Sequence, residues 1–495
     1  MAEPMRLNVL FMASEADPLI KVGGLGDVAG SLPKALRAIH STDDDEQMEL
    51  DIRLVLPFHP SIRQKYPAPQ LISQFTLHAK EKEIPAKAFF LDLNGLPVYL
   101  ISGEPIDQET GVYSLDLEAD GYKYVFFSLA ALQLAQELNW KPDILHANDW
   151  HTAAAVYSLA LRRKADNFFT RTASLLTVHN LPYLGSMTAA GLEAFSLPPA
   201  TSSDLPAWAQ HMALPLGLLA ADSIVAVSPG YAKEILTAEL GSGLDSFLSA
   251  HQEKISGILN GLDTLRWDPS TDQALTSRYT IKTISNRKFN KSALQAELGF
   301  TVEEKVPLLA MVTRMDPQKG VDLAVDAIRS LLRKTRRASV TFQAVLLGTG
   351  DPVLENSVQQ LEHDFPDQVR ARILFDESLS RRIYAGADVF LMPSRYEPCG
   401  LSQMIAMRYG CVPIAHATGG LRDTIHDPKD YRLSTGYLFE KADAKALVKA
   451  IQRALSLFSS YQEGWRDMQI HMMEQNFSWD HSAREYIKQY KLLAC

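Results

Sequence analysis

Residues 389–403, VFLMPSRYEPCGLSQ, give the clearest indication of the fold class. Its first four residues are continuously apolar, which is typical of a strand buried on both faces of a parallel sheet. A polar loop follows, and Pro398, Cys399 and Gly400 are expected to begin a helix. A buried strand, a loop and a helix in this order predict one step of an alternating α/β chain. Glu397 is therefore expected at a strand end.

Similar runs recur along the chain with helical patterns between them. After the first run, for example, apolar residues at three- and four-residue steps from Leu25 to Ile39 predict an amphipathic helix. The strands form two groups, each large enough for one doubly wound sheet, so the sequence predicts an α/β protein with two Rossmann-like lobes. The predicted strands are residues 8–12, 52–56, 144–147, 175–178, 224–227, 308–312, 344–347, 373–375, 389–392 and 412–415.

A turn sequence at residues 260–263 separates the two groups of strands. We expect an N-terminal lobe at residues 1–260, a C-terminal lobe at residues 261–478, and a C-terminal helix at residues 479–495 that packs toward the N-terminal lobe. Weaker breaks are an acidic surface loop at residues 42–46 and a Pro-, Ser- and Ala-rich stretch at residues 197–206.

Composition excludes several classes of protein. The chain has 495 residues, with 49 basic and 58 acidic side chains and a net charge of −9, so charge gives no reason to expect nucleic-acid binding. Three cysteines cannot build a disulfide framework. No apolar run approaches the roughly 18 residues of a membrane span. The short apolar start does not fit a signal peptide, and we expect a soluble, cytoplasmic protein without membrane contact.

Ligands of parallel sheets bind beyond the carboxyl ends of the strands, so the residues that follow each run are candidates. Lys21, Gly23 and Gly24 open the first predicted helix. Their distance from the strand, about ten residues, does not fit the dinucleotide fingerprint, whose glycines lie in the immediate turn. We expect instead a loop whose bare backbone amides meet an anion, with Lys21 adding charge.

The second half offers two cations and a second glycine pair. Arg314 and Lys319 follow a buried strand on either side of a Pro-containing turn, which favours binding of both to one diphosphate. Gly419 and Gly420 precede another helix. Glu397, near such groups, would stabilise positive charge that develops on a sugar while phosphate leaves.

Metal ligation and serine hydrolysis receive little support. His146, Asp149 and His151 lie close in sequence, but His146 and Asp149 fall on different sides of a strand end. The acidic triplet at residues 43–45 lies in a charged loop and is expected to be solvated. No G-x-S-x-G elbow is present. We therefore expect neither a metal nor another cofactor.

Together these segments resemble the bacterial glycogen synthase and plant starch synthase family. The matching pieces appear in the family's order and cover nearly the full chain. They are residues 21–28, 146–151, 177–181, 227–232, 259–263, 314–320, 397–403 and 418–424.

The resemblance implies a GT-B fold, with two doubly wound lobes facing a central cleft. The N-terminal lobe would take the acceptor side and the C-terminal lobe the nucleotide sugar. The implied reaction is retaining transfer of glucose from ADP-glucose to the non-reducing end of an α-1,4-glucan primer, without a metal. Same-face attack and double displacement both remain open.

The resemblance also implies roles for individual residues. Glu397 would stabilise the glucosyl cation, while His179 and Asp149 would contact the sugar. Phe375 falls where the family places a tyrosine that stacks on adenine. The implied donor-binding residues are Lys21, Gly23, Gly24, Arg314, Lys319, Phe375, Gly400, Leu401, Thr418, Gly419 and Gly420.

Departures from the family lie on the acceptor side. Ala213, Leu214 and Pro215 replace a usual Phe-Leu-Lys, and Lys123 and His416 stand where other residues are typical. Two alternatives therefore stay open: a related glucosyltransferase with a smaller or different acceptor, and a non-catalytic glucan-binding relative. A pyridoxal-dependent phosphorylase is disfavoured, because such enzymes are normally far longer and no segment matches their lysine site.

Overall fold

The apolar runs of the sequence form the central strands of two separate sheets. The computed structural model describes residues 5–39, 48–108, 111–335, 342–428 and 430–494. One unit comprises Met1–Gly261 and Trp479–Cys495, and the other comprises Leu262–Ser478. Within the described ranges, the first unit contains a nine-stranded sheet and the second a six-stranded sheet. Both units are α/β units with largely parallel sheets, which confirms the predicted fold class.

The sheet of the first unit has the order β3-β4-β5-β2-β1-β6-β7-β8-β9, and β4 alone runs against the others. Its central strands are buried on both faces because nearly all their residues are apolar. The strands are β1 (Met5–Met12), β2 (Met48–Pro57), β3 (Gln70–His78), β4 (Glu83–Leu93), β5 (Leu96–Gly103), β6 (Ile144–Asn148), β7 (Ala173–Val178), β8 (Ser223–Ala226) and β9 (Ile255–Gly257).

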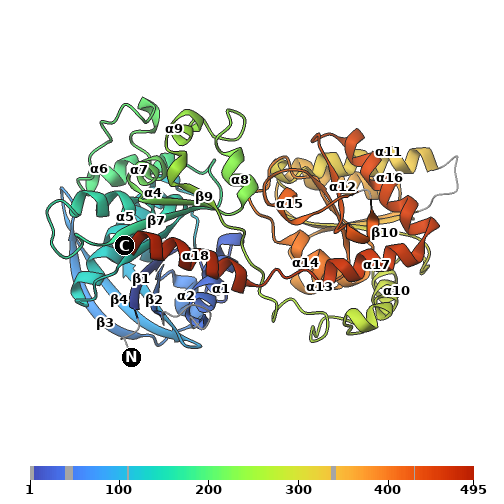
Figure 1. Cartoon of the computed structure of the whole chain (residues 1–495), viewed down its shortest axis with the longest axis horizontal. Helices are drawn as coiled ribbons and strands as arrows, with labels where there is room; N and C mark the ends of the chain where they lie inside the picture. The colour runs from blue at the N-terminus through green and yellow to red at the C-terminus, as the bar shows by residue number, and fades with distance from the viewer. Residues whose placement is uncertain (1–4, 40–47, 109–110, 336–341, 429, 495) are drawn as a thin grey trace. The chain divides into compact units, whose positions relative to one another are not determined.

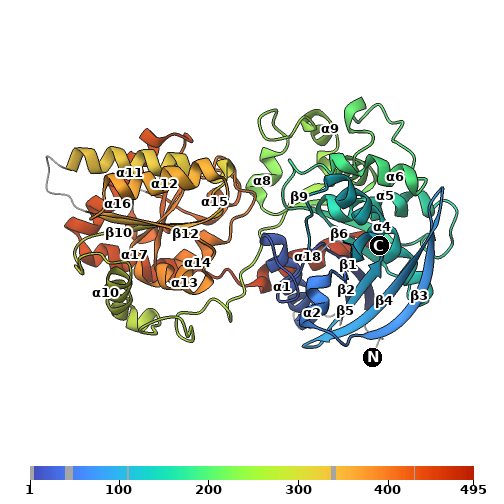
Figure 2. The same ribbon diagram turned by 180° about the vertical axis from the view of Figure 1, so that it is seen from behind.

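The antiparallel edge formed by β3, β4 and β5 was not predicted (Figure 2). Strands β3 and β4 have exposed residues between more buried ones instead of continuous apolar runs, whereas β5 is largely buried. A turn signal was nevertheless present. Asn94 and Gly95 join β4 to β5 with φ of 56° and 85°, the left-handed conformation that this dipeptide favours in two-residue hairpins.

Helices cover this sheet, and the last helix of the chain belongs to this unit. The helix α18 (Trp479–Ala494) packs beside α1 (Figure 1), and its residues Tyr486 and Tyr490 join the buried core of β1, β2 and α1. The other helices are α1 (Gly24–Ala38), α2 (Pro60–Lys65), α3 (Glu104–Asp107), α4 (Leu117–Glu137), α5 (Asp149–Arg162), α6 (Ala189–Ala194), α7 (Ala213–Ala220), α8 (Pro229–Glu234) and α9 (Asp245–Ala250).

The sheet of the second unit is parallel, with the order β12-β11-β10-β13-β14-β15. The prediction of a strand at residues 373–375 is wrong in both bounds: β12 begins at Val369 and ends at Ile373, so Leu374 and Phe375 lie beyond the strand. The short edge strand β15 was not predicted. The strands are β10 (Leu308–Val312), β11 (Gln343–Gly348), β12 (Val369–Ile373), β13 (Val389–Met392), β14 (Val412–His416) and β15 (Tyr437–Phe439).

The helices of the second unit follow its strands in alternation. They are α10 (Arg287–Glu297), α11 (Val321–Thr335), α12 (Pro352–Asp364), α13 (Glu377–Gly386), α14 (Ser402–Arg408), α15 (Gly419–Thr424), α16 (Ala444–Ser460) and α17 (Gln462–Met473). Over the described part of the whole chain, no helix combines the length and apolar character needed to span a membrane. The acidic triplet at residues 43–45 lies outside the described residues.

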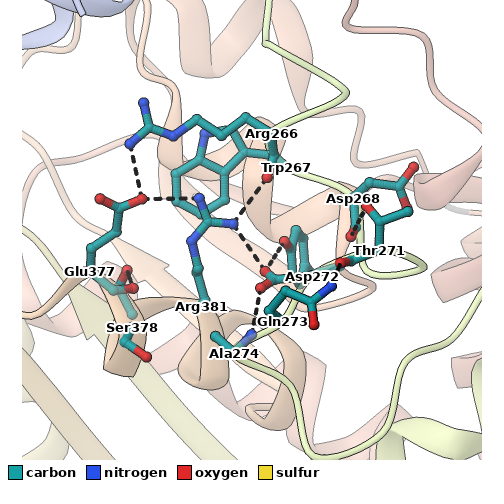
Figure 3. A network of polar contacts seen from close by, with 12 residues as sticks. Arg266, Trp267, Asp268, Thr271, Asp272, Gln273, Ala274, Glu377, Ser378 and Arg381 are labelled. Carbon is teal, nitrogen blue, oxygen red and sulfur yellow. Dashed lines mark hydrogen bonds and ion pairs between the residues drawn. The ribbon is translucent and has the colours of Figure 1, made fainter. Parts of the chain in front are cut away.

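A polar network fixes the segment that opens the second unit (Figure 3). Arg381 on α13 donates to the Asp272 carboxylate (3.0 Å), the Arg266 carbonyl (3.0 Å) and Glu377 (2.9 Å). Its guanidinium also lies 4.2 Å from the ring centroid of Trp267. This segment has little regular structure, so side-chain bonds to α13 replace the backbone pairing of a strand.

Candidate functional site

In the second unit, the carboxyl ends of β10 and β13 bring Lys319 and Glu397 together. The Lys319 ammonium contacts both oxygens of the Glu397 carboxylate, at 2.9 and 2.7 Å. Ser394 donates a further hydrogen bond to Glu397 Oε2 (2.9 Å). Glu397 is 6% exposed, so this carboxylate is held at a fixed place beneath the loop surface. An ammonium group has three N–H donors, and two bonds to Glu397 leave one for a ligand.

The prediction that Pro398, Cys399 and Gly400 begin a helix is wrong, because these residues still belong to the loop that carries Glu397. Helix α14 begins at Ser402, with Leu401 at its N-cap. Gly400 has φ of 75°, a left-handed conformation that interrupts helical geometry and suits glycine. The Gln403 amide group donates to the carbonyls of Cys399 (3.0 Å) and Gly400 (2.9 Å). These bonds hold the loop in one shape.

The Thr418-Gly419-Gly420 segment packs directly against the Glu397 loop. Thr418 is the N-cap of α15, and Gly419 is its first residue. The Gly420 amide donates to the carbonyl of Glu397 (3.1 Å). A Cβ atom at Gly420 would lie 2.2 Å from the Cys399 carbonyl oxygen, so only glycine fits. The structure thus brings these glycines to Glu397, but the Gly420 amide is engaged within the protein.

Two further donor-side candidates are exposed side chains. Arg314 lies between Thr313 and Met315, just after β10, and is exposed. Phe375 is 87% exposed, immediately after β12. Because an exposed large aromatic ring is costly in water, it suits a surface that stacks on a planar ligand.

In the first unit, Asp149 opens α5 in a strained conformation. Its φ is 56°, which is uncommon for a residue other than glycine. The buried carboxylate accepts hydrogen bonds from the backbone amides of His179 (2.7 Å) and Asn180 (3.4 Å). Burial raises the pKa of the Asp149 carboxyl to about 7. These hydrogen bonds therefore connect the carboxyl end of β6 to the loop that follows the carboxyl end of β7.

His179 lies beside Asp149 and is neutral. Its Nε2 atom donates to Asn148 Oδ1 (2.9 Å), and Asn148 in turn donates to the Met12 carbonyl (2.9 Å). Burial lowers the pKa of His179 to about 3, so the ring stays uncharged at neutral pH. A neutral ring and a carboxylate side by side are groups that bind sugar hydroxyls through hydrogen bonds.

His146 and His151 serve other contacts. His146 points to α18, with Nδ1 2.6 Å from the Tyr490 hydroxyl and Nε2 2.8 Å from Thr177 Oγ1. His151 Nε2 lies 3.1 Å from the Tyr113 hydroxyl. Burial lowers the pKa of both histidines. His146 thus uses one ring nitrogen to contact the C-terminal helix and the other to contact β7.

The glycine-rich loop at the start of α1 binds a carboxylate of the protein itself. The amides of Val22 and Gly23 donate to Glu15, and Gly23 lies 3.1 Å from both oxygens. Lys21 forms an ion pair with Asp27 (2.7 Å). The amides predicted to be bare are therefore occupied. Gly24, the first residue of α1, remains exposed.

Sequence reasoning assigned no role to four residues that support these candidates: Glu15, Asn148, Ser394 and Gln403. Each lies within a few residues of a predicted site residue, at a strand end or at a helix start. Their position was a usable signal, because polar side chains at strand ends either meet ligand or orient those that do. Whether such a side chain contacts the ligand or orients another side chain depends on its rotamer, which the local sequence does not determine.

Comparison with protein families matches both units. The profile described as the starch synthase catalytic domain matches residues 8–250. A second profile, described as glycosyl transferases group 1, matches residues 298–463. The two profiles thus fall on the first and the second unit respectively.

Full-length relatives and solved structures indicate the same family as the two profiles. A protein named glycogen synthase from Syntrophotalea carbinolica is 36% identical over 492 residues, covering 98% of each chain. The catalytic domain of starch synthase IV from Arabidopsis thaliana, solved with ADP and acarbose, matches with a TM-score of 0.86 and 32% identity over 99% of both chains. Sucrose-phosphate synthase from Thermosynechococcus elongatus matches at a TM-score of 0.62 and 20% identity over 99% of both chains, which indicates a shared fold.

Proposed function

Because the chain belongs to the glycogen and starch synthase family, we propose that it transfers glucose from ADP-glucose to the non-reducing end of an α-1,4-glucan with retention of configuration. Its two α/β units are those of a GT-B glycosyltransferase. The observation that carries the assignment of the site is the Lys319–Glu397 pair at the strand ends of the second unit.

Lys319 and Arg314 supply the positive charge for the diphosphate of the donor. Lys319 keeps one N–H donor for phosphate while it holds Glu397, and Arg314 is exposed and close in sequence. A guanidinium can bind two phosphate oxygens at once. With these cations and nearby backbone groups, departure of ADP needs no divalent metal in this proposal. Phe375 provides an exposed ring for adenine.

Glu397 acts on the reacting sugar. When the bond between glucose C1 and the β-phosphate oxygen breaks, positive charge develops at C1, and a fixed carboxylate stabilises that charge. The acceptor hydroxyl oxygen forms the new bond to C1, and the departing β-phosphate oxygen takes up the hydroxyl proton. Ser394 and Lys319 hold the carboxylate in place, so no reorganisation is needed in the transition state.

The first unit supplies hydrogen bonds to sugar hydroxyls. Asp149 and neutral His179 are fixed by backbone and by Asn148, which suits recognition of an uncharged ligand. Lys21 and Gly24 are assigned to the donor, with Gly24 offering exposed backbone, whereas the Gly23 amide is held by Glu15. The Arabidopsis starch synthase was solved with ADP and acarbose, and this chain's site residues suit the same two classes of ligand.

The two alternatives predict different products. A glucosyltransferase for a small acceptor would load labelled glucose from ADP-glucose onto maltose or another small acceptor but not onto glycogen. A glucan-binding relative would bind glycogen without releasing ADP. The Glu397, Lys319 and Ser394 arrangement favours catalysis, because binding alone does not require a buried carboxylate held by an ammonium group.

A direct test measures ADP release and glucose incorporation with glycogen, maltose and no acceptor, using ADP-glucose and UDP-glucose in parallel. The proposal predicts incorporation into glycogen from ADP-glucose at the highest rate, unchanged by EDTA. No ADP release with any acceptor, or abolition of activity by EDTA, would contradict it.

A further inference from the structure

The loop that precedes α1 is built around one buried carboxylate. Glu15 follows β1 and is 4% exposed. Its carboxylate accepts hydrogen bonds from the amides of Val22 and Gly23. The side chain thus bridges seven to eight residues of chain and ties the strand end to the start of the helix.

The packing around this carboxylate is tight on one side. The Asp17 amide donates to the Gly26 carbonyl (2.9 Å), which seats the loop on the first turn of α1. A Cβ atom at Gly26 would lie 3.3 Å from Glu15 Oε2 and 2.9 Å from Lys21 Cγ. The side chains of Glu15 and Lys21 therefore fill the space that glycine leaves.

The opposite side of the loop is open. A Cβ atom at Gly24 would meet nothing within 4 Å, and Lys21, Val22 and Gly24 are all exposed. The buried side of this loop is fixed by a carboxylate and its other side is exposed. Such a loop is preorganised to bind a ligand on its exposed side. Without the carboxylate, the Val22 and Gly23 amides would lose their partner, and the open face would lose its shape.

The negative charge of the Glu15 carboxylate disfavours a direct contact between Glu15 and the phosphates of the donor. Burial raises its pKa, while the backbone amides that bind it favour its ionised form. The Lys21 ammonium is already paired with Asp27 (2.7 Å). A second anion on the same amides would meet a carboxylate, so the amides of Val22 and Gly23 serve the loop and not the ligand.

We propose that Glu15 is a positioning residue for donor binding: it fixes the Val22–Gly23 backbone so that Lys21 and Gly24 meet ADP-glucose in the required geometry. This inference rests on the proposed function. It assigns to Glu15 an effect on donor affinity that acts through the loop, without contact between Glu15 and the reacting atoms.

The test compares Glu15→Gln and Glu15→Ala with Glu253→Gln, an exposed carboxylate change in the same unit. Hydrogen exchange at the Val22 and Gly23 amides, measured without ligand, reports the loop directly. Steady-state kinetics give KM for ADP-glucose separately from kcat, and thermal unfolding reports whether the fold is intact. Cleavage by trypsin after the exposed Lys21 is a second measure of loop order.

We expect faster amide exchange and faster cleavage at Lys21 in Glu15→Ala, with KM for ADP-glucose raised about 10–100-fold and kcat changed much less. Glu15→Gln, which keeps one acceptor oxygen, should fall between Glu15→Ala and the wild type. Glu253→Gln should match the wild type. Unchanged amide exchange would overturn the proposal. So would faster exchange with unchanged KM, because Glu15 would then be structural only. Failure of the proposed function would appear instead as absent ADP release in the wild type.

Discussion

At the scale of single residues, the hydroxyl of Ser394 controls the orientation of Glu397. Ser394 is 2% exposed and its hydrogen bond to Glu397 Oε2 is 2.9 Å long. Ser394→Ala removes this bond but leaves the Lys319 pair. We expect kcat to fall about tenfold with little change in KM, because one hydrogen bond to a charged group is lost in the transition state.

Initial rates of ADP release at saturating ADP-glucose and glycogen check this expectation. Ser456→Ala, an exposed serine on α16 in the same unit, is the matched control and should leave kcat unchanged. A Ser394→Ala enzyme with wild-type kcat would show that Lys319 alone fixes the carboxylate.

Asp149 gives a prediction for the pH dependence of stability. Its pKa is about 7 in the folded chain and 3.8 in the unfolded chain, so between these values the folded state binds the extra proton. Stability therefore declines as pH rises through this window, and the contribution is lost above pH 7. Asp149→Asn cannot titrate, so its stability relative to the wild type should rise from pH 5 to pH 8.

Urea unfolding at pH 5, 6, 7 and 8 measures this difference. Asp222→Asn is a suitable control in the same unit: hydrogen bonds and the Arg163 charge outweigh burial and lower the Asp222 pKa. Its titration is therefore complete below pH 5, and the difference from the wild type should stay constant. A constant difference for Asp149→Asn as well would mean that this carboxyl is ionised throughout.

At the scale of elements, the segment after Gly261 depends on helix α13. Arg381 is 13% exposed at its side chain and Asp272 only 3%. Asp272 also accepts from the Tyr409 hydroxyl (2.6 Å). Arg381→Met leaves this carboxylate without its ion-pair partner, so we expect a loss of about 3 kcal/mol in unfolding free energy.

The neighbouring Arg382→Met on the same helix is the matched control. Arg382 pairs with Glu297 at the surface, where both side chains are at least 26% exposed, so its loss should cost less than about 1 kcal/mol. Equal losses for the two variants, measured by chemical unfolding, would show that the Arg381 network does not stabilise the segment.

The elements also show what sequence patterns can predict. Continuous apolar runs located the central strands of both sheets because burial on both faces leaves a strong local signal. Strands β3 and β4 have an exposed face and β15 has only three residues, so they gave no such run, whereas β5 is largely buried and was overlooked. The end of β12 was placed two residues late because Leu374 and Phe375 are apolar but exposed.

The candidate site shows the same division between local and distant information. The pairing of Lys319 with Glu397 joins residues 78 apart in sequence, and a shared sheet edge was enough to expect them near one another. The hydrogen bonds from the Val22 and Gly23 amides to Glu15 were not expected, because they depend on the conformation of the Glu15 side chain. Strand ends are thus predictable from sequence, whereas hydrogen-bond partners require the folded structure.

At the scale of the whole molecule, the proposed function divides the chemistry between the two units. The second unit holds the fixed carboxylate and the cations, which suit a nucleotide sugar. The first unit holds Asp149 and neutral histidine, which suit sugar hydroxyls. The chain crosses between the units at Gly261–Leu262 and again at Ser478–Trp479, since α18 completes the core of the first unit.

The role of Glu397 is tested by the rate of ADP release by Glu397→Ala with ADP-glucose and glycogen, beside the exposed control Glu463→Ala. We expect a loss of about 2–4 kcal/mol in transition-state stabilisation, roughly 30- to 1000-fold in kcat, while ADP still binds. Glu463→Ala should retain the full rate. A Glu397→Ala enzyme that keeps its kcat within about twofold of the wild type would contradict the account.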